Sequence, residues 1–201
     1  LVSAQNLQAF LSTASFSSTE NNYLETYISF DANSLVLESR DNNYFANVDI
    51  VIEISKNGIQ CYHDHYILKS PSFRYKEYNN LFFIDQQRIP LNNGDYTLMV
   101  RLKDANSKEE HPVLFTQEIN INYTDKQLAL SDIQLLESHS PAAEQSTLSK
   151  SGYDITPFIS NFYSQNINQL SFYFEVYNSN NHFSNQKKYL LNTYIESYET
   201  E

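Results

Sequence analysis

Residues 44–69 read YFANVDIVIEISKNGIQCYHDHYILK, and this stretch carries the strongest fold signal in the chain. Before the pair Asn57-Gly58, apolar residues alternate with polar ones, which is typical of a strand with one buried face. Both residues of an Asn-Gly pair tolerate the positive φ of a tight two-residue turn. The stretch therefore predicts a β-hairpin in which residues 59–69 pair antiparallel with residues 44–55.

Similar short segments, rich in Tyr, Phe, Ile and Val, follow one another from residue 23 to residue 123. Their spacing predicts about six to seven strands, as in an immunoglobulin-like sandwich. No stretch sustains the 3.6-residue period of a helix. The triplet Gly94-Asp95-Tyr96 at the start of one strand resembles the tyrosine corner of Greek-key sandwiches, although an ordinary strand tyrosine would fit the sequence equally well.

The segment YLETYISF at residues 23–30 alternates with Leu24 and Ile28 on one face and Glu25 and Tyr27 on the other. Because the first face is apolar and the second carries polar groups, we expect the first in the core and the second in solvent. Residues 170–177, LSFYFEVY, alternate in the same way. The expected inward residues of the whole chain are Leu24, Ile28, Ile50, Ile52, Leu98, Val100, Phe172 and Phe174.

The polar stretch Thr124-Asp125-Lys126 marks a domain boundary, and new strands are expected after it at residues 128–137, 170–177 and 188–198. The chain is therefore expected to be all-β, with tandem immunoglobulin-like β-sandwich domains. The expected divisions are a signal-peptide remnant and polar N-terminal segment at residues 1–22, a first sandwich at 23–125 and a second at 126–201.

The second sandwich is expected to be incomplete, because its sequence offers about four strands where the first offers six or more. A half sandwich leaves one apolar sheet face and a strand edge uncovered. We expect either that further residues of a longer protein cover this face, or that a partner chain donates the covering strands.

The composition excludes several classes of function. With 201 residues and a net charge of −11, the chain is a poor partner for nucleic acid or for an anionic membrane surface. Only three glycines are present, and their spacing excludes glycine-rich phosphate loops. No apolar run reaches the roughly 18 residues of a membrane-spanning helix. We expect no catalytic site and no cofactor, since no nucleophile stands beside a base in an interpretable motif.

Cys61, His63 and His65 alternate along one predicted strand, so their side chains should project from one face. A His-x-His strand of this kind is found in metal sites, which makes these three residues the candidate metal ligands. A metal site needs further ligands that the sequence does not place nearby, and a polar solvent face explains the pattern as well. We therefore predict that the protein holds no tightly bound metal.

Several segments together resemble the N-terminal region of the GWxTD-domain proteins of Bacteroidota. They are YLETYISF (23–30), FIDQQRIPLNNGDYTLMV (83–100), LSDIQLLES (130–138), SGYDITPFISNFY (151–163) and INQLSFYFEVYN (167–178). The resemblance implies an exported protein with β-sandwich modules and no established activity. The GWxTD segment itself is absent from this sequence.

The opening residues Leu1-Val2-Ser3-Ala4 are typical of the end of a secretory signal, although an arbitrary boundary would also explain them. We expect an exported protein that is periplasmic or associated with the outer membrane. Its expected function is that of a non-catalytic interaction or structural module of the cell envelope, within a larger protein or complex. The expected partner is another envelope protein, itself membrane-associated. The alternative is a carbohydrate-binding module, in which some of the 16 tyrosines stack on sugars.

Overall fold

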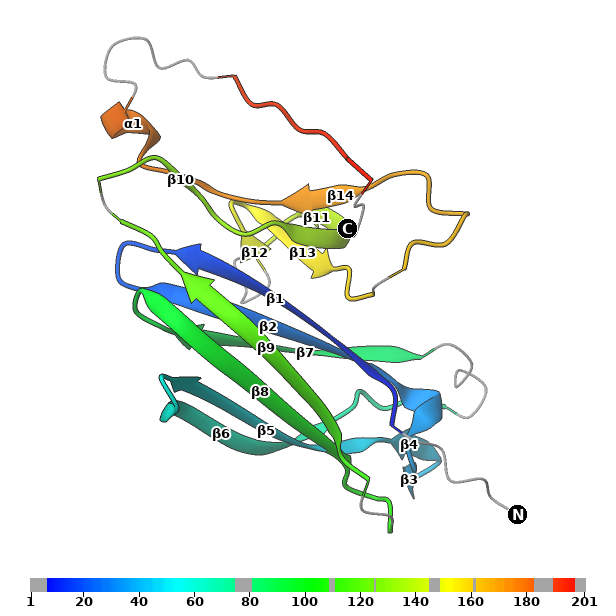
Figure 1. Cartoon of the computed structure of the whole chain (residues 1–201). Coiled ribbons are helices and arrows are strands. Elements are labelled where there is room, and N and C mark those ends of the chain that lie inside the picture. The colour runs from blue at the N-terminus through cyan, green and yellow to red at the C-terminus, as the bar shows by residue number, and fades with distance from the viewer. Residues whose placement is uncertain are drawn as a thin grey trace.

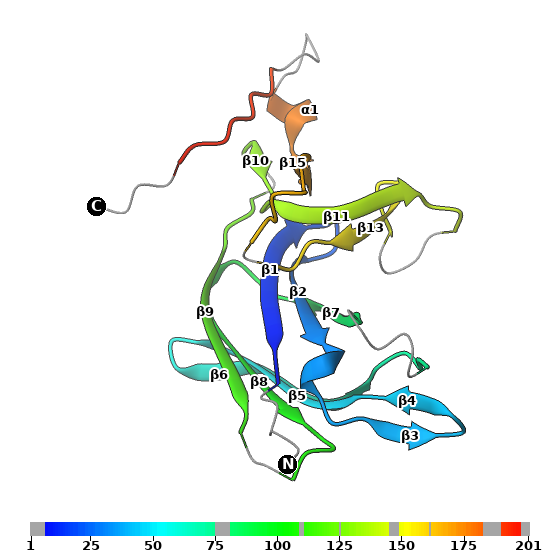
Figure 2. The same cartoon turned by 90° about the vertical axis from the view of Figure 1, so that its right-hand side faces the viewer.

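The protein folds into three stacked layers of antiparallel β-sheet, seen from two directions in Figure 1 and Figure 2. The computed structural model describes residues 7–74, 81–108, 111–124, 126–144, 149–160, 162–182 and 190–197. The prediction of an all-β protein built on a sandwich is confirmed. The immunoglobulin-like type of the sandwich stays a prediction.

The first two layers form the sandwich. In spatial order, one sheet contains β1 (Ala9–Ser17), β2 (Asn22–Asp31) and β7 (Phe82–Pro90). The facing sheet contains β6 (Ile59–Lys69), β5 (Asn47–Lys56), β8 (Gly94–Asp104) and β9 (Val113–Ile121). A short hairpin of β3 (Glu38–Arg40) and β4 (Asn43–Phe45) and the 3₁₀ turn η1 (Ala32–Ser34) lie at one end.

The third layer follows in sequence. Its sheet contains, in spatial order, β12 (Ser149–Lys150), β13 (Tyr153–Pro157), β11 (Gln134–Pro141) and β14 (Ser171–Tyr173). Next to it, β10 (Ala129–Leu130) pairs with β15 (Val176–Tyr177), and the helical turn α1 (Ser179–His182) follows.

The hairpin predicted from residues 44–69 is present. β5 pairs with β6 along its length, and the turn residues Asn57 and Gly58 have φ values of 52° and 76°. Both values lie in the left-handed region that the Asn-Gly pair tolerates. The tyrosine corner is also confirmed, because the Tyr96 hydroxyl donates a hydrogen bond to the Asn92 carbonyl oxygen at 2.9 Å.

The core of the sandwich lies between its two sheets. The six inward residues predicted for this part of the chain are all buried there, namely Leu24, Ile28, Ile50, Ile52, Leu98 and Val100. The edge strand β1, at residues 9–17, lies in the stretch that the sequence analysis assigns to the polar N-terminal segment. It pairs with β2 over nine residues, and its Ala14 and Phe16 are buried. The sequence did not predict this strand because it is rich in Ser and Thr; Ser15 is buried, and Ser12, Thr13 and Ser17 are partly buried.

The outer face of β2 is buried, and the prediction that it faces solvent is wrong. Glu25 and Tyr27 are as inaccessible as the core residues on the opposite face. The third layer covers them (Figure 1), and Phe16, Tyr27 and Ile159 form a second apolar cluster between the layers. A strand that is covered on both sides cannot be distinguished by alternation alone from one that is half exposed.

An ion cluster around Glu25 joins the layers. One carboxylate oxygen accepts hydrogen bonds from Arg88 Nε and Nη2 at 2.9 and 2.6 Å. The other accepts from Lys150 Nζ of β12 at 2.6 Å and from the Tyr27 hydroxyl. Lys150 also donates to Gln134 Oε1 at 3.1 Å and lies over the Phe16 ring. Burial lowers the pKa of the Lys150 ammonium, and the adjacent Glu25 carboxylate opposes this shift.

A second set of hydrogen bonds joins the third layer to the unpaired edge of β1. Asp132 Oδ2 accepts hydrogen bonds from the backbone N–H and the hydroxyl of Ser15, at 2.8 and 2.7 Å. The Asp132 N–H in turn donates to the Ser15 carbonyl oxygen at 3.2 Å. These bonds satisfy backbone groups at an otherwise open strand edge.

The faces of β14 are inverted relative to the prediction. Ser171 and Tyr173 lie on the face of β14 that is turned toward the sandwich. The sequence predicts that Phe172 and Phe174 point inward. Instead, Phe172 is exposed and Phe174 lines an open groove. The strands after residue 126 form one layer of two adjoining sheets, and the sandwich supplies the surface that faces it. The expected boundary residue Asp125 lies outside the described residues.

At one edge of the sandwich, β6 and β7 are the outermost strands of their sheets, and side-chain hydrogen bonds join them. The Tyr66 hydroxyl donates to Asp85 Oδ2 at 2.6 Å, and Gln87 Nε2 donates to Asp85 Oδ1 at 3.2 Å. Asp85 is buried at an inward position. Burial raises the pKa of its carboxyl above the ordinary value of 3.8, and the two hydrogen bonds oppose this shift.

The Glu25 cluster gives a stability prediction. Glu25→Ala leaves the Lys150 ammonium buried without a counter-charge, so it should lower the free energy of unfolding by about 3 to 5 kcal/mol in urea titrations. Arg88→Ala removes a half-exposed partner and should cost about 1 kcal/mol or less. The double variant Glu25→Leu with Lys150→Met should recover most of the loss, because it removes both charges. Equal losses for Glu25→Ala and Arg88→Ala would contradict this account.

Asp85 gives a pH prediction. A raised folded-state pKa means that the folded chain binds this proton more tightly than the unfolded chain, so ionisation of Asp85 costs stability as the pH rises through that pKa. Asp85→Asn removes this cost and keeps an acceptor for Tyr66. The unfolding free energy of Asp85→Asn minus that of the wild type should therefore increase between about pH 4 and pH 7. Asp95→Asn, at an exposed position on β8, is the control; parallel curves for Asp85→Asn and wild type would refute the prediction.

Candidate functional site

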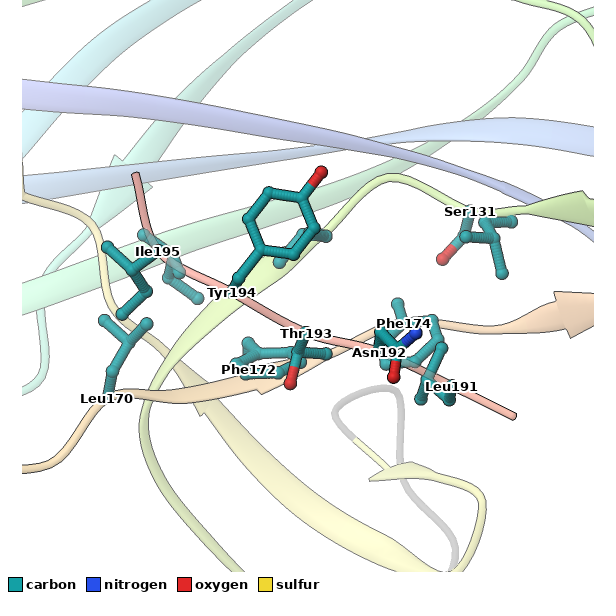
Figure 3. A pocket seen from close by; sticks show the side chains of 12 residues that line it. Ser131, Leu170, Phe172, Phe174, Leu191, Asn192, Thr193, Tyr194 and Ile195 are labelled. Atoms are coloured by element: carbon teal, nitrogen blue, oxygen red, sulfur yellow. The ribbon is translucent and has the colours of Figure 1, made fainter. Parts of the chain in front are cut away.

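An apolar groove runs along the outer face of the third layer (Figure 3). One wall comes from residues 130–135 at β10 and β11, and the floor from residues 170–174 at β14. The segment 190–197 lines the opposite wall with residues 191–195. It has no regular secondary structure, so the strand predicted at residues 188–198 is wrong for these residues. The groove has a volume of about 660 Å³. It is therefore large enough to hold several side chains of a second molecule.

The lining of the groove is predominantly apolar. Most of its lining residues are aliphatic or aromatic, and among those that the structure describes none carries a charge. Ile133 is 62% exposed, Leu130 is 54% exposed, and Phe172 is 36% exposed. Large apolar side chains grouped in this way on a sheet face mark an interaction site more often than a solvated surface. This agrees with the prediction that the second sheet leaves an apolar face uncovered.

A polar network on the other face of β14 and β15 explains why this side is open. The Tyr173 and Tyr177 hydroxyls each donate to the Glu175 carboxylate at 2.6 Å, and the Tyr177 hydroxyl accepts from the Ser17 N–H at 2.9 Å. Burial raises the pKa of both tyrosines, and Glu175 raises it further. The hydroxyls therefore stay protonated as donors. Because this network fixes Tyr173, Glu175 and Tyr177 against the sandwich, the alternate residues must face outward.

The candidate metal ligands lie far from the groove, on the outer face of β6. Cys61, His63 and His65 are all exposed there. His63 Nδ1 is 3.2 Å from a Glu53 oxygen, and His65 Nε2 is 2.8 Å from an Asp49 oxygen. Each histidine thus contacts a separate carboxylate.

Among the residues described by the structure, no group of three or more His, Cys, Asp or Glu side chains is placed to hold a metal ion. The sequence pattern brings the three candidate ligands to one face, as expected, without the additional ligands that a site requires. The absence of a tightly bound metal stays a prediction.

Of the tyrosines that could stack on sugars, several are turned inward, whereas Tyr153 and Tyr194 are 48% and 77% exposed. Tyr27, Tyr173 and Tyr177 take part in contacts between the layers, and their hydroxyls are bound to carboxylates. They therefore do not form an exposed aromatic surface. Within the described part of the chain, no helix is long and apolar enough to cross a bilayer.

No protein-family model, no curated protein and no solved structure matches this chain. The resemblance to the GWxTD-domain proteins therefore stays a prediction. The groove residues could not be assigned from the sequence, because Phe172 and Phe174, which line the groove, follow the same alternation as a core strand. Only an indirect indication of the groove was present, because the sequence offers too few strands to cover the second sheet.

Proposed function

We propose that this protein is a non-catalytic interaction module of the bacterial cell envelope, within a larger protein or complex. It binds a partner protein through the open apolar face of the third layer. The observation that carries the proposal is the groove between residues 130–135 and 170–174, which exposes large apolar side chains without any charge in its lining. Burial of such a surface supplies the driving force for association.

The rigidity of the opposite face supports the same proposal. The third layer is fixed to the sandwich by the buried Glu25–Lys150 pair and by the bonds between Asp132 and Ser15. The sheet that forms the floor of the groove is thus fixed, so the protein itself loses less conformational entropy on binding a partner than it would with a mobile surface.

Export to the periplasm or to the outer membrane belongs to the proposal as well. It rests on the resemblance to the GWxTD-domain proteins. The expected partner is another, membrane-associated envelope protein, and the charge of −11 makes nucleic acid an unfavourable ligand.

The carbohydrate-binding alternative has less support. Sugar sites combine an aromatic face with polar groups that bind hydroxyls. The lining of the groove offers few such groups, chiefly those of Ser131, Asn192 and Thr193. Reproducible binding on a glycan array that is lost in a groove variant would favour this alternative.

Site-specific photo-crosslinking tests the proposal. A photoreactive residue replaces Ile133 in the groove, and a matched one replaces Ile59, which is 74% exposed at the tip of the β5–β6 hairpin. In the cells that produce the protein, one protein species should crosslink at position 133 and not at position 59. The same products at both positions, or none at position 133, would contradict a docking role for the groove.

A further inference from the structure

The strand β14 is the outermost strand of the third layer. Its ladder with β11 joins Tyr173 to Gln134, Phe172 to Leu135 and Ser171 to Leu136. Among the described residues, no strand pairs with its other edge. A free strand edge presents a row of backbone N–H and C=O groups that a further strand can bind.

The side chains of β14 determine which strand would fit. Leu170 and Phe172 point into the groove, while the Tyr173 ring packs against Phe16 on the side of the sandwich. A strand added beside β14 would likewise place every second side chain over the groove. Because the lining carries no charge, those alternate side chains must be apolar.

The protein's own segment 190–197 shows that an extended peptide fits this position. In Figure 3, Leu191 lies at the Phe174 end of the groove and Ile195 at the Leu170 end. Residues 191–195 therefore run antiparallel to residues 170–174. The segment's contact with the sheet is loose, because Ile195 is 84% exposed and no hydrogen bond between described residues joins the segment to β14.

We propose that the partner of the groove is an extended strand of another protein with apolar residues at alternate positions. This inference rests on the proposed function. The strand forms an antiparallel ladder with the free edge of β14 and places its apolar side chains beside Phe172, on the face of the sheet that lines the groove. It takes the position of segment 190–197, which lines the groove without ladder hydrogen bonds to β14 among the described residues.

Peptide binding tests this directly. The receptor is the full chain with Leu191→Asp and Ile195→Asp, because the tethered segment otherwise competes at a high effective concentration. The probe is a synthetic peptide with the sequence of residues 190–197, labelled for fluorescence anisotropy. It should bind this receptor more tightly than the wild-type chain. Phe172→Asp or Ile133→Asp in the receptor should abolish binding, and Ile59→Asp should leave it unchanged.

Backbone methylation separates strand addition from simple apolar contact. In a strand, successive N–H groups point to opposite edges, so only one alternate set can reach β14. One probe is N-methylated at positions 191, 193 and 195, and the other at 192, 194 and 196. One of the two should bind at least about tenfold more weakly than the unmodified peptide, and the other should bind nearly as well.

The outcomes distinguish this inference from the proposed function. Strand addition is overturned if both methylated peptides bind equally well. It is also overturned if no peptide binds while position 133 still crosslinks to a partner. In both cases the groove remains a docking site. A dimer in sedimentation that the peptide dissociates would show that the occupant is a second copy of this chain, which also overturns the inference. Absence of both peptide binding and crosslinking would overturn the proposed function itself.

Discussion

The buried carboxylate of Glu25 is the contact on which the three-layer arrangement depends. It lies on the outer face of β2, where a charge is tolerated only if it is paired. Arg88 provides one partner from within the sandwich, and Lys150 provides the other from the third layer. Neither layer alone satisfies all the charged groups of this cluster. Docking of the third layer is therefore coupled to the pairing of Lys150 with Glu25. This pairing determines which face of the third layer is turned toward the sandwich and which face remains uncovered.

Alternation in the sequence predicted the strands well and their orientation only in part. In the sandwich, Ile50, Leu98 and their neighbours are inward as predicted, because the strands that carry them bury their apolar residues between the two sheets. In residues 170–177 the rule is inverted. Tyr173 and Glu175 lie inward because they satisfy one another by hydrogen bonding, and no single-strand pattern can reveal that partnership.

The same limit explains the groove. A sequence indicates that Phe172 and Leu135 are apolar, yet whether they are covered depends on what other chain segments reach them. The deficit of strands after residue 126 predicted an uncovered face, and the structure shows where it lies. By contrast, Cys61, His63 and His65 share a strand face as predicted, but a metal site also needs ligands from other strands.

Hydroxyl-radical footprinting of the intact protein tests the central claim, that the third layer covers the outer face of the sandwich and leaves its own apolar face open. Tyr27 and Tyr153 are chemically identical probes with exposed fractions of 1% and 48%. The account predicts that Tyr153 and Phe172 are oxidised and that Tyr27 is protected until the protein unfolds. Oxidation of Tyr27 at the rate of Tyr153 in the folded protein would contradict it.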